Sequence, residues 1–514
     1  MLFLLIFAVL VVLYYLYIKP FWYWESRNVP YQNPVPLFGN MFKPIFKKEQ
    51  LISIVQNIYT KCPDSPYFGF INFITPILII KDPELIKKIT VKDFDVFSRH
   101  RAFASEDMDP LWSKNLFAIQ DFHKWRHLRA TLSPAFTASK LRMMFDLMQE
   151  CAKNFVNYYL QKTEDVIELD VKDACRRFAT DVIATTAFGV TCDSLKNQDN
   201  KFYLMGKDVT NFEGIRALKI FVYNSCPKLI ELLRLSIFGP QVTNFFTKVV
   251  SDTVRLREEQ NIIRPDMIHL LMEARKGKLK KDKSNDLEVD SFAAVNESEI
   301  VQKEVGGSTQ ITDEEMTAQA LIFFFGGFDT SSSLMSFTFA ELAVNPDIQK
   351  KLYDEINEVS ERTGGKITYD DIHRMKYLDM VTSESLRKWT QGVFLDREAV
   401  KPYTIPRDNG QPPLKIEKGD LVWIPAYSIH RDPKYFPEPE KFDPERFSYE
   451  RKNEIKPFTY LPFGAGPRNC IGSRFALLES KIAIFNIILN FEVVPTGKVT
   501  IPLKLDSHKI SPTT

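Results

Sequence analysis

The chain of 514 residues is long enough for one large domain or for two to three small ones. Its formal net charge of +2 gives no global basic surface for nucleic acid, and its six cysteines, none in a C-x-x-C pair, are too sparse for a disulfide scaffold or a zinc ribbon. Hydrophobic residues make up 45% of the chain and 41 residues are phenylalanine, which favours a large apolar core and an apolar pocket.

The first segment, residues 1–18, carries no charged side chain. As a helix it would span roughly 27 Å, close to the thickness of a bilayer core. An aromatic cluster follows at residues 21–24, and basic residues outnumber acidic ones as far as residue 49, which predicts that the rest of the chain lies in the cytosol. We interpret residues 1–18 as a transmembrane anchor. The alternative is a cleaved secretory signal, but the segment lacks a basic start and a small-residue cleavage site.

Beyond the anchor, residues 19–40 predict an aromatic and proline-rich hinge, because prolines at 30, 34 and 36 stiffen an extended chain. Residues 41–514 predict a single large domain, mainly α with a smaller β portion. Helix-period segments dominate from about residue 120 to 390, whereas short apolar runs such as residues 421–427 predict strands and turns in the last part. A Lys-rich, polar break at residues 276–310 predicts a mobile surface loop.

Two pairs of side chains share the segment near residue 125. Trp125 and Arg129 are four residues apart, so on a helix they lie on one face. His123 and His127 have the same spacing and could begin a metal site. No third ligand is evident, so we interpret them as solvated histidines.

A long helix is predicted between Thr312, which has capping-box spacing to Glu315, and Asn345, which precedes a proline. Gly326 and Gly327 interrupt its centre, at a cost of about 1 kcal/mol each relative to alanine. The Thr330 hydroxyl can bond back to the Gly326 carbonyl and bend the helix. This pattern indicates either a groove that another group approaches or a packing kink with a satisfied threonine.

The strongest motif is FGAGPRNCIG at residues 463–472, with the skeleton F-x-x-G-x-R-x-C-x-G. Residues 471–489 predict a helix just after Cys470, and thiolates form readily at helix N-termini and beside cations such as Arg468. A thiolate is a strong axial donor to heme iron and favours O–O cleavage. The alternative is a buried structural cysteine after a glycine turn.

The neighbours of Cys470 fit a heme ligand. Gly466 and Gly472 permit a tight turn and a close backbone approach to the ring and the sulfur. Phe463 can shield the sulfur from water, and Arg468 can pair with a heme propionate.

This loop matches the heme-binding loop of the cytochrome P450 family at every defining position. The chain resembles the family along nearly its whole length, in the order anchor, proline hinge, Trp-x-x-x-Arg helix, interrupted helix, Glu-x-x-Arg, Pro-Glu-Arg-Phe and cysteine loop. It is most similar to the insect microsomal P450s associated with xenobiotic metabolism, through FFFGGFDTSSSLMSF (323–337) and VPLFGN (35–40). The resemblance implies a P450 fold and heme b, with Cys470 as the only protein ligand to the iron.

The resemblance also implies roles for other residues. Asp329 and Thr330 match the acid–alcohol pair that relays protons to the active site. Further partners of the heme propionates are implied at Trp125, Arg129 and Arg397. A buried structural network behind the heme is implied for Glu384, Arg387 and Arg446. One departure stands out, because residues 388–392 read KWTQG where the family often has a pair of prolines.

The function implied is monooxygenation of a lipophilic small molecule at the cytosolic face of the endoplasmic reticulum membrane. Residues 101–118, 205–225, 321–330 and 393–395 are placed around the substrate by analogy. No G-x-G-x-x-G motif in a βαβ context is present, so electrons must come from a partner. The resemblance implies NADPH–cytochrome P450 reductase, with cytochrome b5 as an occasional second donor. Their docking face would include Lys124, Arg126 and Lys140, for which an ordinary solvated surface is the alternative.

Three other readings stay open. The enzyme could oxidise an endogenous lipid or hormone rather than a xenobiotic. It could isomerise or dehydrate peroxides without a reductase, which the intact Asp329–Thr330 pair disfavours. Finally, it could be a non-enzymatic heme sensor or lipophile-binding protein.

Overall fold

The structure, a computed structural model, describes residues 2–15, 19–46, 48–212, 214–225, 230, 232–277, 291–294, 311–407, 410–497 and 503. The surface loop predicted over residues 276–310 lies almost wholly outside this described part, and so does the end of the predicted anchor, residues 16–18.

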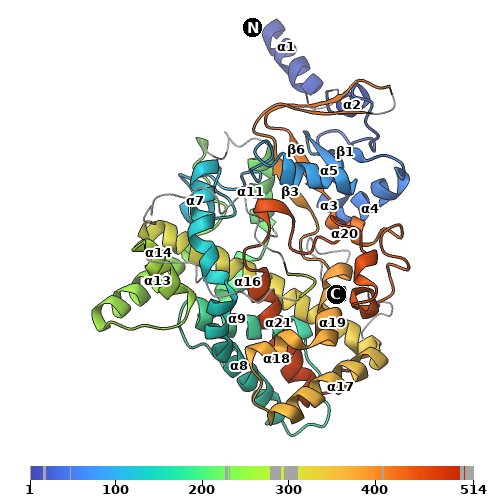
Figure 1. The fold of residues 1–514 in the computed structure, drawn as a ribbon. Helices are drawn as coiled ribbons and strands as arrows, with labels where there is room; N and C mark the ends of the chain where they lie inside the picture. The colour runs from blue at the N-terminus through green and yellow to red at the C-terminus, as the bar shows by residue number, and fades with distance from the viewer. Residues whose placement is uncertain are drawn as a thin grey trace.

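Helices build most of the molecule (Figure 1). The α-helices are α1 (Leu2–Leu13), α2 (Lys19–Glu25), α3 (Phe42–Ile45), α4 (Leu51–Lys61), α5 (Pro83–Lys87), α6 (Pro110–Ser113), α7 (Phe122–Leu132), α8 (Ala138–Leu160), α9 (Val171–Ala187), α10 (Lys201–Val209), α11 (Gly214–Ser225), α13 (Pro240–Gln260), α14 (Met267–Arg275), α16 (Asp313–Val344), α17 (Pro346–Thr363), α18 (Tyr369–Arg374), α19 (Lys376–Lys388), α20 (Ala426–His430) and α21 (Ser473–Asn490). The described residues also form a π-helix at Lys88–Lys92 and 3₁₀ turns at Ser133–Phe136, Pro444–Phe447, Lys452–Glu454 and Gly466–Arg468.

The strands gather on one side of the helical body. They are β1 (Tyr67–Asn72), β2 (Thr75–Ile80), β3 (Leu395–Glu398), β4 (Tyr403–Ile405), β5 (Leu414–Ile416) and β6 (Leu421–Ile424). One sheet has the order β1-β2-β6-β3, in which only β2 and β6 run parallel, while β4 and β5 form a separate antiparallel pair. The sheet therefore joins the N-terminal part of the chain to its C-terminal part. The predicted fold class, mainly α with a smaller β portion, is confirmed.

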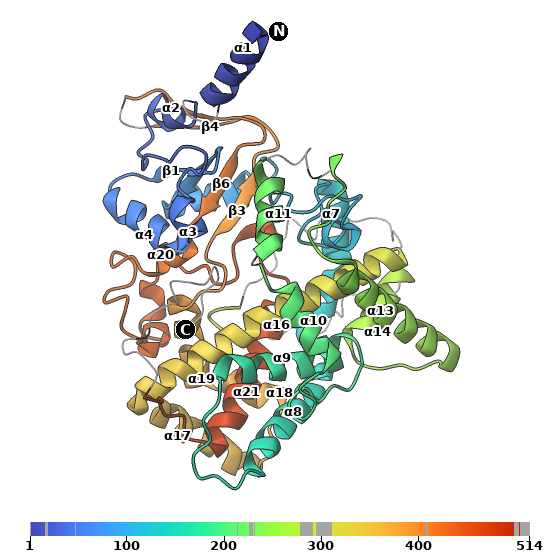
Figure 2. The same cartoon turned by 180° about the vertical axis from the view of Figure 1, so that it is seen from behind.

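The long helix predicted after Thr312 is α16, which crosses the helical body (Figure 2). The predicted capping box is present, since the Glu315 amide donates to the Thr312 hydroxyl at 3.1 Å and the Thr312 amide donates to the Glu315 carboxylate at 2.9 Å. The helix ends before Asn345 and its proline, as predicted. In the described part of the chain, α16 is the helix with the length and hydropathy of a membrane span, but its burial makes it a core helix.

Among the described residues, the buried hydrophobic side chains form two large cores and one small cluster. One joins the helices around α16, and the other packs the sheet against α4 and α5. The helix α1 belongs to neither core. Its described side chains are exposed, and it projects from the body (Figure 1).

Candidate active site

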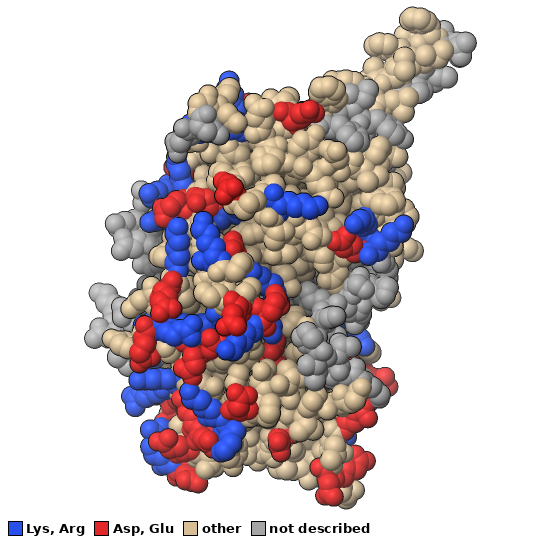
Figure 3. Space-filling view, turned by 90° about the vertical axis from the view of Figure 1, so that its right-hand side faces the viewer, with Lys and Arg blue, Asp and Glu red and all other residues tan. Residues whose placement is uncertain are grey.

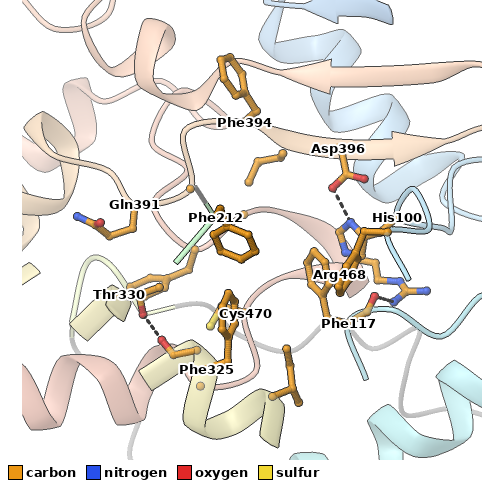
Figure 4. Close-up of a pocket in the computed structure, with 18 of the residues that line it drawn as sticks. His100, Phe117, Phe212, Phe325, Thr330, Gln391, Phe394, Asp396, Arg468 and Cys470 are labelled. Atoms are coloured by element: carbon orange, nitrogen blue, oxygen red, sulfur yellow. Dashed lines mark hydrogen bonds and ion pairs between the residues drawn. The ribbon is translucent and has the colours of Figure 1, made fainter. Parts of the chain in front are cut away.

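A large cavity of about 1330 Å³ lies between α16, the cysteine loop, β3 and α11. Figure 4 shows Cys470 near its centre, with Thr330 and Phe325 on one side and Arg468 and His100 on the other. Each of the four segments placed around the substrate by analogy contributes lining residues, for example Phe117, Phe212, Phe325 and Phe394. The cavity also extends to α3 and to the turn after β1, at Asn72 and Phe73, which the sequence did not indicate.

Cys470 faces this cavity from a loop just before α21. Its backbone amide donates to the Phe463 carbonyl at 2.9 Å, which closes the loop around the sulfur. Burial raises the pKa of the Cys470 thiol, although the Gly472 amide and the Arg129 guanidinium act in the opposite direction. Such a thiol is best deprotonated by a metal cation that takes the place of its proton, as thiolate coordination to iron would do.

The glycines of the cysteine loop differ in backbone conformation and in the space around their Cα atoms. Gly466 has a φ of +70°, and a Cβ there would lie 1.8 Å from the Thr90 carbonyl oxygen. It packs against backbone and is not among the cavity-lining residues, unlike Gly464, which has a φ of +78° and does line the cavity. Gly472 also lines the cavity, with a φ of −94° that any residue can adopt. The close approach predicted for Gly466 therefore involves Thr90 of the π-helix.

Three buried guanidinium groups line the cavity beside Trp125: Arg129, Arg397 and Arg468. Many of their hydrogen bonds go to neutral groups. Arg129 donates to the Asn469 carbonyl at 2.9 Å, Arg397 to the Ala465 carbonyl at 3.1 Å and Arg468 to the Ser98 carbonyl at 3.0 Å. Burial lowers the pKa of Arg397 to about 10, and burial together with Arg397 lowers the pKa of Arg468 well below its ordinary value.

Among the described lining residues at this end of the cavity, the acidic side chain is Asp396, whose charge acts on Arg397 and Arg468. The cluster therefore has an excess of buried positive charge, which two carboxylates would balance. Heme b carries two propionates, so the charge of the cluster fits this group, and the Cys470 thiol fits its iron. The Arg468 guanidinium also lies 4.1 Å from the centre of the Trp125 ring, so the side chains predicted as propionate partners form one cluster.

Sequence reasoning missed His100 as a member of this cluster. Its Nδ1 lies 2.8 Å from Asp396 Oδ1, and its ring stacks on Phe117 with centroids 4.3 Å apart. Burial lowers the pKa of His100 against the opposing effect of Asp396. The two residues are 296 positions apart and share no motif, so no local signal could have joined them.

The interrupted centre of α16 forms one wall of the cavity. The Thr330 hydroxyl donates to the Gly326 carbonyl, as predicted. A Cβ at Gly326 would meet nothing within 4 Å, whereas one at Gly327 would lie 2.6 Å from Ile183 of α9. Gly326 therefore leaves open space beside Thr330, and Gly327 lets α9 pack closely behind it.

Asp329 has a different environment from Thr330. It is not among the described lining residues, and its carboxylate pairs with Arg176 at 2.8 Å and with Lys172 at 3.3 Å, both on α9. Adjacent helical residues do not share a face, which explains why the acid and the alcohol point to different sides. Burial opposes ionisation, but Lys172 and Arg176 outweigh it and lower the pKa of Asp329. Burial in turn lowers the pKa of Lys172 to about 8.

Glu384 and Arg387 form a fully buried ion pair on α19, with Arg387 Nε donating to Glu384 Oε2 at 2.7 Å. Arg446 Nε lies 3.5 Å from Glu384, so the three residues meet as the resemblance implied. Arg387 also donates to the His430 and Pro439 carbonyls at 2.8 Å each. These bonds tie α19 to the segment that leads to the cysteine loop.

Contacts with α16 explain how the KWTQG segment after Arg387 keeps its path without a pair of prolines. Trp389 is buried, stacks on Phe337 with centroids 4.7 Å apart, and donates its indole N–H to Glu341 at 2.8 Å. Lys388 pairs with the same carboxylate at 2.8 Å. The chain then reaches the cavity at Gln391, whose amide bonds the Trp389 carbonyl at 2.8 Å. The hydrogen bond of Trp389 and the ion pair of Lys388, both to Glu341 of α16, thus fix the path of this segment. In the family, a pair of prolines often stiffens the chain at this point.

The three basic residues expected at the docking face for the electron donor differ in exposure and in pairing. Lys124 is exposed but pairs with Glu315 at 2.7 Å, while Arg126 and Lys140 are half-buried. His123 is exposed and His127 half-buried, and no group of three or more metal-binding side chains occurs within the described ranges.

Comparison with known proteins gives consistent matches. A family model described as Cytochrome P450 matches residues 29–513. Cytochrome P450 9e2 of Blattella germanica is 46% identical over 498 residues, which cover 94% of this chain and 90% of the relative. Probable cytochrome P450 9f2 of Drosophila melanogaster is 43% identical over 493 residues, covering 94% and 91%, and Cytochrome P450 6k1 of Blattella germanica is 37% identical over 506 residues, covering 98% and 94%.

Proposed function

Since the chain belongs to the cytochrome P450 family and is therefore a heme-thiolate monooxygenase, we propose that it oxidises lipophilic foreign compounds. The electrons would come from NADPH through NADPH–cytochrome P450 reductase, with cytochrome b5 as an occasional second donor. When bound, heme b supplies the oxygen chemistry, which an axial thiolate from Cys470 favours.

The observation that carries the proposal is the distribution of charge in the cavity. Among its described lining residues, the acidic and basic side chains are those of the cluster at His100, Arg129, Asp396, Arg397 and Arg468, and Glu49 near α3. Phenylalanines line much of the remainder. A lipophilic molecule can fill this space without stranding a charge, whereas a charged substrate would lose its hydration.

Thr330 and Asp329 are proposed to deliver protons from α16. The Thr330 hydroxyl already donates to Gly326, so its oxygen can accept a further hydrogen bond on the cavity side. Asp329 exchanges protons with the Lys172 ammonium, whose lowered pKa eases release. A change of side-chain rotamer would bring the Asp329 carboxyl from α9 toward the neighbouring Thr330.

The remaining cofactor contacts are also proposals. Trp125, Arg129, Arg397 and Arg468 would hold the propionates, and Phe463 would shield the sulfur. Gly466 and Gly472 shape the loop that presents Cys470, the former through its contact with Thr90.

We also propose that the enzyme is anchored at the cytosolic face of the endoplasmic reticulum membrane, with residues 1–18 as the anchor, 19–40 as the hinge and 41–514 as the catalytic domain. The described part of α1 carries no charge and is exposed. Charged side chains gather toward the far end from α1 on the face in Figure 3, and the surface next to α1 carries few. Two apolar side chains of α11, Ile215 and Leu218, are also exposed.

The test uses the full chain with the reductase and NADPH, offered alkoxycoumarins, steroids and fatty acids. We expect NADPH-dependent oxygenated products, and preference for the alkoxycoumarins would separate a xenobiotic role from a role in endogenous lipid oxidation. The reduced protein with carbon monoxide should show the red-shifted Soret band of thiolate ligation, and Cys470→Ser should abolish it. A protein that forms this band but couples NADPH to no product would overturn the proposal.

A separate variant, Thr330→Ala, tests the proton-delivery proposal. Thr330→Ala should divert electrons from product to peroxide while heme stays bound. Fully coupled turnover in Thr330→Ala would show that this hydroxyl is not part of the relay.

A further inference from the structure

The surface loop predicted over residues 276–310 contains a short segment that the structure describes, residues 291–294, which we name the docked turn. Ser291 and Ala293 are buried, with 8% and 3% of their surface exposed, and Phe292 and Ala294 are half-buried. The Ala294 amide donates to the Ser291 carbonyl at 3.1 Å, which closes the turn. These four residues are therefore part of the packed protein rather than of a solvated surface loop.

Polar contacts hold the start of the docked turn against two helices. The Ser291 hydroxyl donates to Asp379 Oδ1 at 2.6 Å, and the Phe292 amide donates to Asp379 Oδ2 at 3.1 Å. Asp379 belongs to α19, and it also pairs with Lys481 of α21 at 2.6 Å. Hydrogen bonds to a charged acceptor are roughly twice as strong as those between neutral groups, so this carboxylate joins the docked turn firmly to both helices.

The aromatic side chain of the docked turn packs on the segment that leads to the cysteine loop. The Phe292 ring lies 5.0 Å from the Phe447 ring and 5.5 Å from the Tyr460 ring, measured between centroids. The Phe447 and Tyr460 rings lie 5.0 Å from each other, so each of the three rings contacts the other two. Phe292 therefore completes an aromatic cluster a few residues before Cys470 in the chain.

Ala293 belongs to a small apolar cluster that connects the docked turn with the wall of the cavity. The other buried members of this cluster are Leu334, Leu386 and Leu477. The Phe463 side chain packs against them. Leu334, Leu386 and Phe463 line the cavity, whereas no residue of the docked turn is among its described lining residues. The cluster thus has the cavity on one side and the docked turn on another.

We propose that Phe292 and Ala293 are positioning residues for the thiolate, because they close the outer side of the apolar layer behind Cys470 and keep water from its sulfur. Phe463 transmits the contact, since its side chain packs on this layer while its carbonyl accepts the Cys470 amide at 2.9 Å. Water that reaches a thiolate hydrogen-bonds to it and weakens its donation to iron, so an apolar shell tunes the metal. This inference rests on the heme-thiolate function above and is independent of the substrate class.

Hydrogen exchange of the full-length, heme-loaded protein tests whether the turn is docked, and it needs no turnover. One net hydrogen bond corresponds to about a tenfold change in an equilibrium constant, so the Phe292 and Ala294 amides should exchange at least about tenfold more slowly than in an unfolded peptide. Ser291→Ala removes one donor to Asp379 and should speed both by about tenfold. Exchange of the wild type at the unfolded rate would overturn the inference even if the enzyme is active.

A second measurement follows the thiolate in Phe292→Ala. In the reduced protein with carbon monoxide, the red-shifted Soret band should be replaced by the band of a protonated or displaced sulfur about tenfold faster than in the wild type. This magnitude follows because each of the two lost ring contacts is worth about twofold to tenfold in an equilibrium constant. Phe292→Leu, which keeps an apolar side chain in the same space, should restore most of the wild-type rate. An unchanged rate in Phe292→Ala contradicts the proposal.

Phe245→Ala is the matched control for a general loss of stability. Phe245 of α13 is half-buried like Phe292, and its ring contacts those of Phe202 and Phe246 at 5.2 Å each. Phe245→Ala should lower the free energy of unfolding in guanidinium to a similar degree but leave the conversion rate of the Soret band unchanged. Equal acceleration in both alanine variants would show a merely structural effect and overturn the proposal. A wild type that never forms the thiolate band would instead refute the function on which the inference rests.

Discussion

Gly466→Ala is the sharpest test of how the cysteine loop is held. The new Cβ would lie 1.8 Å from the Thr90 carbonyl oxygen and 2.7 Å from its carbon, at a residue with a φ of +70°. The left-handed conformation costs about 1–2 kcal/mol for an L-residue with a side chain. Relief of the clash requires the backbone to shift by more than about 1 Å, and such overpacking adds about 1–3 kcal/mol. The total of about 2–5 kcal/mol falls on the loop that carries Cys470.

Gly464→Ala provides a matched control in the same loop. Its φ of +78° imposes the same conformational cost, but the nearest atom to its Cβ would be 3.7 Å away. We expect Gly464→Ala to lose only about 1–2 kcal/mol and to keep its heme. Gly466→Ala should lose heme and the thiolate Soret band, measured as heme per polypeptide and as the carbon monoxide difference spectrum during guanidinium unfolding. Equal heme content and equal stability of the two variants would refute the steric argument.

Three further predictions concern buried charge. Glu384→Gln should destabilise the protein by about 3–5 kcal/mol, because it strands the buried Arg387 guanidinium; chemical unfolding followed at the Soret band measures this. Trp389→Phe should cost about 1–3 kcal/mol in the same assay, since it removes the indole donor to Glu341 but keeps an aromatic ring. The melting temperature should fall as pH rises from about 4.5 toward about 8, because folded Glu479 retains a proton that the unfolded chain releases, and Glu479→Gln should flatten this slope.

The ion-pair prediction and the pH prediction each have a clear contrary result. For the ion pair, Glu445→Gln is the control, because its partner Lys351 is exposed and such a surface pair contributes at most about 1 kcal/mol. Equal losses in Glu384→Gln and Glu445→Gln would contradict the buried network. A melting temperature whose pH slope is the same with and without Glu479 would contradict the burial argument.

Local patterns were enough to predict the elements that carry the chemistry. The capping box at Thr312, the Thr330 bond to Gly326 and the helix after Cys470 all depend on residues within a few positions of one another. Their energetics are set by backbone geometry, which sequence spacing reports directly.

Contacts between distant segments could not be predicted in the same way. Asp396 meets His100 across 296 positions, and Asp329 meets Arg176 across 153. The path of KWTQG depends on Glu341, 48 positions from Trp389. Each of these side chains has several chemically equivalent partners in the sequence, and only the packing of the helices selects one.

The buried arginines show how cofactor and fold depend on each other. Arg129, Arg397 and Arg468 are held near one another in a low-dielectric interior, and for Arg397 and Arg468 the nearby anionic charge does not offset desolvation. The backbone carbonyls that accept their hydrogen bonds orient them but add no net charge. Binding of an anionic heme would therefore relieve a repulsion built into the polypeptide and, since it favours the folded state, stabilise the protein by mass action. By the same reasoning, replacing Arg397 or Arg468 with a neutral residue should weaken heme retention while making the heme-free protein more stable.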